Sequence, residues 1–270
     1  MGAIGVFDSG VGGLSVLREI RRELPHEALR YVADSAYAPY GDKPADFVVR
    51  RSLALADFLI GTGATSLVVA CNTATAAAVD TLRERFAVPI VGIEPAVKPA
   101  VEHTLAGTVG VLTTSRTALS ARFHRLLDRF RGTRRIIVQP CPGWVELVER
   151  GVLDGPEAVA AVQQYVAPVI GEGADVLVLG CTHYSFLSPI IRQVVGDAVL
   201  LVDPAPAVAR HLRYRLHQAG LLSSPSEHGR EQFWTSADPA VLAPLMSELW
   251  GSRVPLESLP PAFHDTPVRL

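Results

Sequence analysis

Two of the three cysteines lie after short apolar segments that have the length and composition of buried strands. Cys71 follows Leu67–Ala70, and Cys181 lies just beyond Val176–Leu179. Polar residues follow each cysteine, as at the start of a helix, where backbone N–H groups favour a thiolate and can bind an oxyanion. A small, unreactive core thiol is the alternative for any single cysteine. Cys141 has no counterpart elsewhere in the chain, and we interpret it as a core or loop residue.

The chain contains an internal repeat that includes both of these cysteines. Gly5–Ser9 is echoed by Gly110–Thr114, and Leu67–Thr73 is echoed by Leu177–His183, in the same order and at nearly the same separation. Each match alone is weak among valine-rich strands, but the common order favours a duplication. If the two halves face each other, two thiols flank one cleft. A carbon held between them can lose a proton to one thiol and gain it from the other, which is the chemistry of a two-base racemase.

Other uses of these residues are less well supported by the sequence. Cys181 and His183 are both zinc ligands by type, but no Cys-x-x-Cys or His-x-x-x-His pair completes the set. A cysteine hydrolase needs a spatial rather than a sequential Cys-His pair, and it would leave Cys71 unexplained. Pyridoxal phosphate needs a Schiff-base lysine, and neither Lys43 nor Lys98 lies in a convincing cofactor site. We therefore expect neither a metal nor a cofactor.

A glycine-rich turn, Asp8–Gly13, follows the first apolar segment and opens a helix. Its spacing is similar to the dinucleotide fingerprint, and Asp34 stands where the ribose-binding acid would be. Ser15 breaks the fingerprint, however, and Asp8 would repel a pyrophosphate. We expect instead that backbone N–H groups and the Ser9 hydroxyl hold a small anion, with Asp8 beside it. The alternative is that Asp8 only caps the helix.

Composition indicates a folded protein with no affinity for nucleic acid. Of 270 residues, 49% are hydrophobic and 19% are charged, and the formal net charge is −2. This composition excludes general disorder and provides no large positive field for a phosphate backbone. Three cysteines are a poor basis for a disulfide framework, and no secretion signal, lipid signal or membrane-length apolar stretch is present in the sequence. We expect a soluble, cytoplasmic protein.

Apolar segments rich in valine and isoleucine alternate with segments of helical periodicity. This alternation predicts an α/β fold with mostly parallel sheets, whose strands are covered on both faces. Helices are expected over Leu14–Leu24 and Phe123–Phe130. Sites in such folds lie at the carboxyl ends of strands. The predicted strands are Ala3–Phe7, Leu29–Ala33, Ser66–Ala70, Ile90–Ile93, Val109–Leu112, Ile136–Gln139, Val176–Leu179 and Val199–Val202.

The repeat also predicts how the chain divides into domains. We expect a first α/β domain of residues 1–96 plus 207–270 and a second of residues 97–206, with the first crossing between Glu94 and Thr108. Each domain should be a three-layer α/β/α unit. A pseudo-twofold axis should relate the two, with the active site in the cleft between them.

The last part of the chain is too short to form a domain of its own. A strand at Gln232–Thr235 and a helix at Pro239–Trp250 are expected to pack against the first half, because they lack a sufficient core. Pro260–Leu270 is expected to be a loose tail.

Several motifs, in this order and spacing, resemble those of bacterial glutamate racemases, which belong to the aspartate/glutamate racemase family. The resemblance runs from about Gly2 to about Leu259. It implies the aspartate/glutamate racemase fold and a cofactor-independent enzyme that interconverts L- and D-glutamate and supplies D-glutamate for peptidoglycan. The motifs are Asp8-Ser-Gly-x-Gly-Gly, Pro39-Tyr-Gly41, Cys71-Asn-Thr-Ala74, Gly92-Ile-Glu-Pro95, Gly180-Cys-Thr-His-Tyr184 and Phe233-Trp-Thr-Ser-Ala-Asp238.

The resemblance also implies roles for individual residues. Cys71 and Cys181 are the two acid/base residues, each serving one enantiomer, and Asp8 and His183 are their assistants. Glu149 matches a family glutamate near the second cysteine. The residues implied to hold the amino acid are Asp8, Ser9, Tyr40, Gly41, Asn72, Thr73, Thr114, Thr117, Thr182 and His183.

Three residues depart from the family pattern. Thr113 replaces the usual glycine before Thr114, which puts the implied substrate contacts of this turn in doubt. Trp144 stands where a smaller apolar residue is common, and Pro44 replaces a usual serine.

Two other functions stay open at this point. A racemase of aspartate or of a hydantoin would use the same two cysteines, because their geometry does not measure the length of the substrate side chain. A binding protein would hold an amino acid in the same cleft or contact another protein such as DNA gyrase, as some family members do, although the paired cysteines argue against it. The expected partner is glutamate. The sequence does not set the oligomeric state, because family members form dimers of different kinds, and a homodimer is one of the assemblies it allows.

Overall fold

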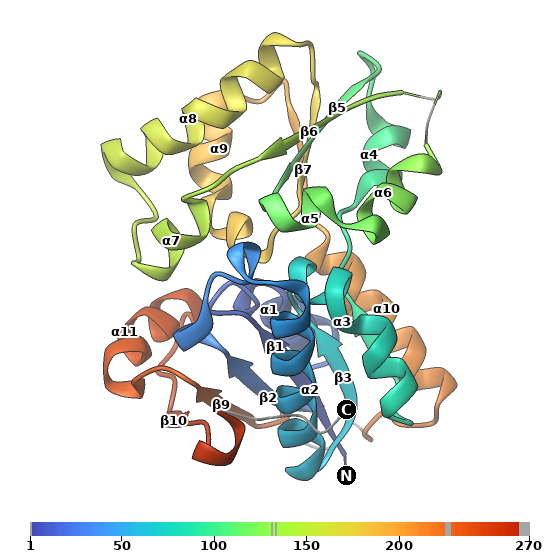
Figure 1. The fold of residues 1–270 in the computed structure, drawn as a ribbon, viewed down its shortest axis with the longest axis vertical. Coiled ribbons are helices and arrows are strands. Elements are labelled where there is room, and N and C mark those ends of the chain that lie inside the picture. The colour runs from blue at the N-terminus through green and yellow to red at the C-terminus, as the bar shows by residue number, and fades with distance from the viewer. Residues whose placement is uncertain (1, 131, 133, 225–227, 265–270) are drawn as a thin grey trace.

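The computed structural model describes residues 2–130, 132, 134–224 and 228–264, and two sheets form its frame (Figure 1). The strands are β1 (Ala3–Asp8), β2 (Ala28–Ala33), β3 (Ala64–Val69), β4 (Ile90–Gly92), β5 (Thr108–Thr113), β6 (Arg135–Pro140), β7 (Val176–Leu179), β8 (Leu200–Val202), β9 (Glu231–Thr235) and β10 (Leu256–Ser258). One sheet has the order β10-β9-β2-β1-β3-β4, and the other has the order β6-β5-β7-β8. All pairings between the described strands are parallel. The predicted α/β class is confirmed, and the ends of the predicted strands differ by one or two residues.

Helices cover both faces of each sheet. We call the part that carries the six-stranded sheet the first half and the part that carries the four-stranded sheet the second half; they are the lower and upper parts of Figure 1. The helices are α1 (Leu14–Glu23), α2 (Ala45–Gly61), α3 (Asn72–Arg85), α4 (Val97–His103), α5 (Ser115–Leu119), α6 (Ala121–Asp128), α7 (Trp144–Glu149), α8 (Gly155–Gly171), α9 (Ser188–Val195), α10 (Ala205–Gln218) and α11 (Pro239–Trp250). Short 3-10 segments are η1 (Ser35–Tyr37), η2 (Tyr40–Asp42), η3 (Thr182–Leu187) and η4 (Pro261–Phe263).

The alternation of side chains along β1 shows how the layers form. Ile4 and Val6 are buried together with Leu17 of α1, whereas Phe7 is buried on the opposite face with Leu55 of α2. A strand that is covered on both faces needs apolar residues at consecutive positions, which explains the continuous apolar segments of the sequence. The core cluster around α1 continues into the second half and includes Cys181.

The internal repeat is present in the topology. The order β2-β1-β3-β4 in the first half matches the order β6-β5-β7-β8 in the second. Gly5 pairs with Leu67 between β1 and β3, and Gly110 pairs with Leu177 between β5 and β7. A Cβ atom on either glycine would press against the Leu67 or Leu177 side chain, at 2.9 Å and 2.6 Å respectively. The same close approach is therefore built into equivalent positions of both sheets.

The edge strands of the second sheet pack apolar residues on both faces but are less buried than its central strands. β6 is half-buried along most of its length, and Leu200 at the start of β8 is exposed. The six-stranded sheet continues beyond β2 through β9 and β10, whereas the second sheet ends at β6. Edge strands have fewer neighbours, so a continuous apolar segment does not by itself report burial.

The C-terminal part of the chain packs on the first half, as predicted. β9 pairs with β2, and β10, which the sequence did not predict, pairs with β9. α11 spans the predicted residues, and its Met246 and Leu249 join the core around α1.

The prediction of a loose tail from residue 260 is wrong for residues 260–264, whereas residues 265–270 lie outside the described part of the chain. η4 packs the Phe263 ring against Phe58, with ring centroids 5.3 Å apart. Tyr37 donates a hydrogen bond to the backbone oxygen of His264 at 2.8 Å. The sequence suggested a tail because the ends of chains are often loosely held. Contacts made through backbone oxygens leave no signal in the sequence.

The chain passes between the halves twice, once between β4 and α4 and once between β8 and α10. Both crossings lie near the predicted domain limits of 96/97 and 206/207, which stay a prediction. No helix in the described part of the chain is long and apolar enough to cross a membrane.

Candidate active site

The candidate site lies where the carboxyl ends of the two sheets face each other. Asp8 ends β1, and Cys71 follows β3; Thr114 and Cys181 follow β5 and β7 in the second half. The Thr182 hydroxyl lies 3.5 Å from Asp8 Oδ2, a contact between the halves. Parallel strands bring their carboxyl ends to one edge, and the repeat places equivalent residues on both sides.

Cys71 lies at the N-terminus of α3, as predicted. Its Sγ accepts a hydrogen bond from the backbone N–H of Ala74 at 3.4 Å and lies 3.7 Å from Ser9 Oγ. Burial raises the pKa of the Cys71 thiol well above its ordinary value, and the nearby charges of Asp8 and Cys181 act in the same direction. The predicted shift toward thiolate is therefore wrong for Cys71, because burial outweighs the helix N-terminus.

Cys181 has a basic neighbour instead. Its Sγ lies 3.8 Å from His183 Nδ1, and His183 Nε2 lies 2.6 Å from Glu149 Oε1. Burial lowers the pKa of His183, but the hydrogen bonds with Cys181 and Glu149 outweigh burial and raise that pKa well above its ordinary value. The raised pKa favours the protonated form of the His183 ring, which lies beside the Cys181 sulfur.

Glu149 connects the two halves. It is the last residue of α7, and its Oε1 also accepts a hydrogen bond from the backbone N–H of Val11 at 2.7 Å. The Ser35 hydroxyl donates to its other oxygen at 3.3 Å. Val11 and Ser35 belong to the first half, so one carboxylate links both of them to His183.

Two backbone N–H groups of the glycine-rich turn are used within the protein. Val11 donates to Glu149 Oε1, and Gly13 donates to Asp8 Oδ2, both at 2.7 Å. Asp8 thus binds the first turn of α1, close to the capping role considered as the alternative. Burial raises its pKa, against the opposing effect of the His183 charge. The anion site expected at this turn stays a prediction.

The glycines of this turn are required by the approach of the second half. A Cβ atom on Gly12 would collide with the His183 ring, and one on Gly10 would collide with the Glu149 carboxylate. Tyr31 of β2 donates a hydrogen bond to the Gly10 oxygen at 2.7 Å and holds the turn in place. The pattern that resembled a nucleotide fingerprint therefore makes room for two side chains of the protein itself.

Three buried threonines form a hydroxyl cluster between the halves. Thr73 Oγ1 lies 3.1 Å from Thr114 Oγ1 and 3.3 Å from Thr117 Oγ1, and Thr114 and Thr117 are 3.1 Å apart. Thr73 comes from α3, and the other two come from the turn after β5. A Cβ on Gly41 would lie 3.3 Å from Thr114 Cβ, so the predicted Tyr40-Gly41 turn faces this cluster.

Asn72 carries a buried amide whose oxygen and nitrogen have no hydrogen-bond partner among the described residues. Only 4% of the residue is exposed, and a buried amide without partners costs about 1–3 kcal/mol. Such an amide, one residue after Cys71, is suited to a polar ligand.

Tyr40 has a different environment from the one the sequence implied, because its hydroxyl is already engaged. It donates a hydrogen bond to Asp34 Oδ2 at 2.5 Å, and Arg51 pairs with the same carboxylate at 2.7 Å. Asp34 and Arg51 were not among the predicted site residues. Arg51 lies within the apolar periodicity of α2, where a buried arginine gives no distinct sequence signal.

The residues that depart from the family pattern have structural explanations in part. Trp144 is fully buried, packs edge-to-face on Tyr184 at 4.8 Å, and donates to the backbone oxygen of Ala161 at 3.0 Å. Thr113 is also fully buried, and its hydroxyl has no partner among the described residues. Pro44 precedes the first turn of α2, a position that proline tolerates.

Cys141 is buried in the core cluster and its Sγ lies 3.4 Å from the Gln139 oxygen. Burial raises the pKa of its thiol. These surroundings agree with the structural role predicted for it.

In the described part of the chain, no group of three or more His, Cys, Asp or Glu side chains is arranged to hold a metal ion. His183, which is a zinc ligand by residue type, directs its Nε2 to the Glu149 carboxylate.

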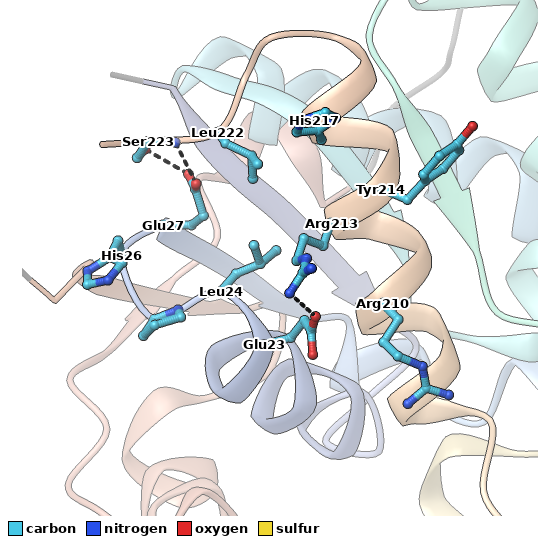
Figure 2. A pocket seen from close by; sticks show the side chains of 11 residues that line it. Glu23, Leu24, His26, Glu27, Arg210, Arg213, Tyr214, His217, Leu222 and Ser223 are labelled. Carbon is cyan, nitrogen blue, oxygen red and sulfur yellow. Dashed lines mark hydrogen bonds and ion pairs between the residues drawn. The ribbon is translucent and has the colours of Figure 1, made fainter. Parts of the chain in front are cut away.

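A groove lies away from both cysteines, between the loop after α1 and the second half of α10 (Figure 2). Its volume is about 610 Å³. Two of its charged side chains have partners within the protein: Arg213 pairs with Glu23, and the buried Glu27 carboxylate accepts hydrogen bonds from Ser223 (Figure 2). The two cysteines are 5% and 7% exposed, so the candidate site is closed.

The fold and the paired thiols agree with a family assignment. A family model described as Asp/Glu/Hydantoin racemase matches residues 4–212, and the chain belongs to this family.

Individual relatives extend the comparison over nearly the whole chain. The chain is 50% identical to a protein named glutamate racemase from Methylococcus capsulatus, over 96% of both chains. A glutamate racemase from Pseudomonas aeruginosa is 50% identical, over 93% of this chain and 94% of the relative. Among solved structures, a glutamate racemase isoform from Bacillus anthracis superposes with a TM-score of 0.88 at 31% identity, covering 96% of this chain and 98% of the other. Escherichia coli glutamate racemase, in complex with L-glutamate and the activator UDP-MurNAc-ala, gives a TM-score of 0.84 at 32% identity, with the same coverage.

Proposed function

We propose that this protein interconverts L- and D-glutamate without a cofactor, with Cys71 and Cys181 as the two bases. The observation that carries the proposal is that two buried thiols, from equivalent positions of a repeated topology, reach one closed site. The charge of Cys181 contributes to the raised pKa of Cys71, which reflects their proximity. The names of the relatives support glutamate as the substrate.

The reaction needs one thiolate and one thiol on opposite faces of the substrate carbon. The thiolate takes the α-proton, and the electron pair of the C–H bond moves into the carboxylate, which becomes an enediolate. The opposite thiol then donates its proton to the carbon, and its sulfur is left negatively charged. Each turnover therefore inverts the carbon and exchanges the protonation states of Cys71 and Cys181.

His183 and Asp8 are the groups that adjust these protonation states. The His183 ring, held by Glu149 and with a raised pKa, is the cationic neighbour of the Cys181 sulfur. The Asp8 carboxylate near Cys71 favours a protonated thiol there.

The polar groups around the cysteines are suited to hold an amino acid. The unpartnered amide of Asn72 and the hydroxyl cluster of Thr73, Thr114 and Thr117 are buried, so their hydrogen bonds to a carboxylate are not weakened by competing water. The hydroxyls of Thr182 and Ser9 lie beside the Asp8 carboxylate. The closed arrangement excludes water, which strengthens the stabilisation of an enediolate.

Further parts of the proposal concern the use of the product, the location of the protein and the limits of its domains. A supply of D-glutamate for peptidoglycan and a cytoplasmic location fit a glutamate racemase. The domain limits 1–96 plus 207–270 and 97–206 fit the two crossings between the sheets. Movement of these domains would open the site for the substrate.

The experiment is to incubate the purified protein in D2O with L-glutamate and, separately, with D-glutamate, without added cofactor. Circular dichroism follows the loss of optical activity, and NMR follows deuterium at Cα. We expect racemisation from both enantiomers with one deuterium incorporated into each inverted product. L-aspartate and a hydantoin are the comparison substrates. Exchange with these and not with glutamate would replace the proposed substrate, and binding seen only as a shift of the melting temperature would identify a binding protein.

A further inference from the structure

The C-terminal segment of residues 260–264, which we call the strap, packs on the surface of the first half. Leu259, just before it, is 1% exposed and donates its backbone N–H to the Thr235 oxygen at 2.7 Å. The Phe263 ring packs on Phe58. The strap therefore has a fixed position on the protein.

The strap presents two backbone oxygens to Arg51. Arg51 Nη1 donates to the Phe263 oxygen at 2.6 Å and to the His264 oxygen at 2.7 Å. The Tyr37 ring covers the guanidinium at 4.3 Å, and its hydroxyl donates to the same His264 oxygen. A buried guanidinium is stable only when its donors are satisfied, and the strap satisfies one end of it.

The other end of Arg51 holds Asp34, and Asp34 holds Tyr40. Arg51 donates through Nε at 2.9 Å and through Nη2 at 2.7 Å to the two oxygens of Asp34. Tyr40 donates to Asp34 at 2.5 Å, and all three residues are at most 5% exposed. The next residue, Gly41, faces Thr114 of the hydroxyl cluster. A continuous set of charged hydrogen bonds therefore runs from the strap to the active-site turn.

We infer that Arg51 is a positioning residue and that the strap, acting through it, fixes the Tyr40-Gly41 turn against the substrate site. The inference rests on the proposed function, because it assigns this turn to the binding of glutamate. Without the guanidinium, the Asp34 carboxylate lacks a counter-charge, and the turn is no longer held next to Thr114. Substrate binding should weaken, while Cys71 and Cys181 stay intact.

The test compares Arg51→Met with Arg50→Met in the full-length protein. Arg50 is the adjacent residue on α2, and it forms an ion pair with the exposed Asp46 at 2.6 Å. We expect Arg51→Met to raise KM for glutamate about 10-fold with a smaller change in kcat, because a charged hydrogen-bond network is lost at the turn. Arg50→Met should leave both within about twofold.

Further variants separate the positioning role of Arg51 from an effect on the general stability of the protein. Phe263→Ala removes the anchor of the strap without touching Arg51, Asp34 or the cysteines, and it should also raise KM, about 3-fold, because it weakens only one end of the network. In the double variant the effects should be less than additive, because both changes act through the same hydrogen bonds. Methylguanidinium should lower the KM of Arg51→Ala, whereas the same concentration of methylammonium should not.

The outcomes are distinct for the inference and for the proposed function. Absence of glutamate racemisation in the unmodified protein would overturn the proposed function. An active unmodified protein, together with Arg51 and Phe263 variants that fold and retain an unchanged KM, would overturn the role of the strap.

Discussion

The two cysteine environments have the same place in the topology and opposite electrostatics. In the first half, Cys71 begins the long helix α3, accepts an N–H from Ala74, and lies near the Asp8 carboxylate. In the second half, Cys181 precedes the 3-10 segment η3, makes no capping hydrogen bond among the described residues, and lies beside His183. The duplication therefore supplies the positions of the two thiols, and the neighbouring side chains give them different surroundings.

This difference teaches that a repeated fold can hold two thiols in surroundings of different charge. A two-base reaction needs an acid and a base at the same time, and two identical environments would not favour one over the other. The Asp8 charge raises the pKa of the Cys71 thiol, whereas the neighbour of Cys181 is the His183 ring, whose own pKa is raised. The following changes break or sharpen that contrast, from the largest expected effect to the smallest.

Replacing either cysteine removes one side of the pair. Cys71→Ser and Cys181→Ser should each lower kcat/KM for racemisation about 10³-fold, because a serine hydroxyl is a much weaker acid/base group at neutral pH. The loss must be equal from L- and D-glutamate, since the enantiomers have the same free energy in solution. Circular dichroism measures both directions, with Cys141→Ser as the buried-thiol control that should retain activity.

An elimination reaction that needs only one base distinguishes the two cysteines, which the racemisation rate does not. A glutamate analogue with a leaving group on Cβ needs only proton abstraction, so each serine variant should eliminate from the one enantiomer served by its remaining cysteine. Near-normal racemisation by both variants would contradict the two-thiol mechanism.

Gly12→Ala should damage only the second-half environment. Its Cβ would collide with the His183 ring, and the strain of about 1–3 kcal/mol should lower kcat/KM about 30-fold. A steady-state assay measures this, and the substrate deuterium isotope effect should become larger for the enantiomer whose proton Cys181 removes. Gly61→Ala is the matched control, because nothing lies within 4 Å of its Cβ. Equal effects of the two alanines would show that the close approach of His183 is unimportant.

Glu149→Gln should weaken the charge on His183. The raised pKa of His183 means that its contribution to stability is fully present below its unfolded pKa of about 6.5 and is lost as the pH rises through the folded pKa. The variant should lower that folded pKa, shift the alkaline limb of the kcat/KM profile to lower pH, and reduce activity about 10-fold at neutral pH.

The same variant should reduce the free energy of unfolding by about 2 kcal/mol near pH 6, with a smaller difference at alkaline pH. Urea unfolding across the pH range measures this. Glu146→Gln, on the same helix and exposed, is the control. An alkaline limb that does not move would contradict the role of Glu149 in holding the charge on His183.

The smallest effects should come from the feature that the halves share. Gly5→Ala and Gly110→Ala each place a Cβ against the equivalent leucine, and we expect each to cost about 2 kcal/mol of unfolding free energy. Gly171→Ala, with open space around its Cβ, should be nearly neutral. Unequal costs, separated by more than about 1 kcal/mol in urea unfolding, would mean that the repeated glycine does not have the same role in both halves.

Local patterns predicted most of the fold. Continuous valine-rich segments gave the strands of both sheets because burial on both faces requires them, and the repeat gave two halves. β10 was missed because Leu256–Ser258 is only three residues long and mostly exposed. The packing of the strap was missed because Phe263 and His264 are held through their backbone oxygens, which carry no sequence signature.

The candidate site was predictable where chemistry depends on side-chain type and spacing. The structure brings Cys71, Asp8, Cys181, His183 and Glu149 together, as the sequence resemblance implied. It could not be predicted that the glycine-rich turn binds the Glu149 carboxylate, because that contact joins residues 138 positions apart. The effect of burial on Cys71 was equally inaccessible, since burial follows from the closure of two halves.

The repeated order of the two sheets has a stereochemical consequence. A single half with one thiol can take a proton from a carbon and return it only to the same face, which exchanges the hydrogen and retains the configuration. Inversion requires a second thiol on the far face. Under the proposed mechanism, the second copy of the strand order provides it, so a fold with two copies of one topological unit can invert a carbon at which a single copy could only exchange the hydrogen.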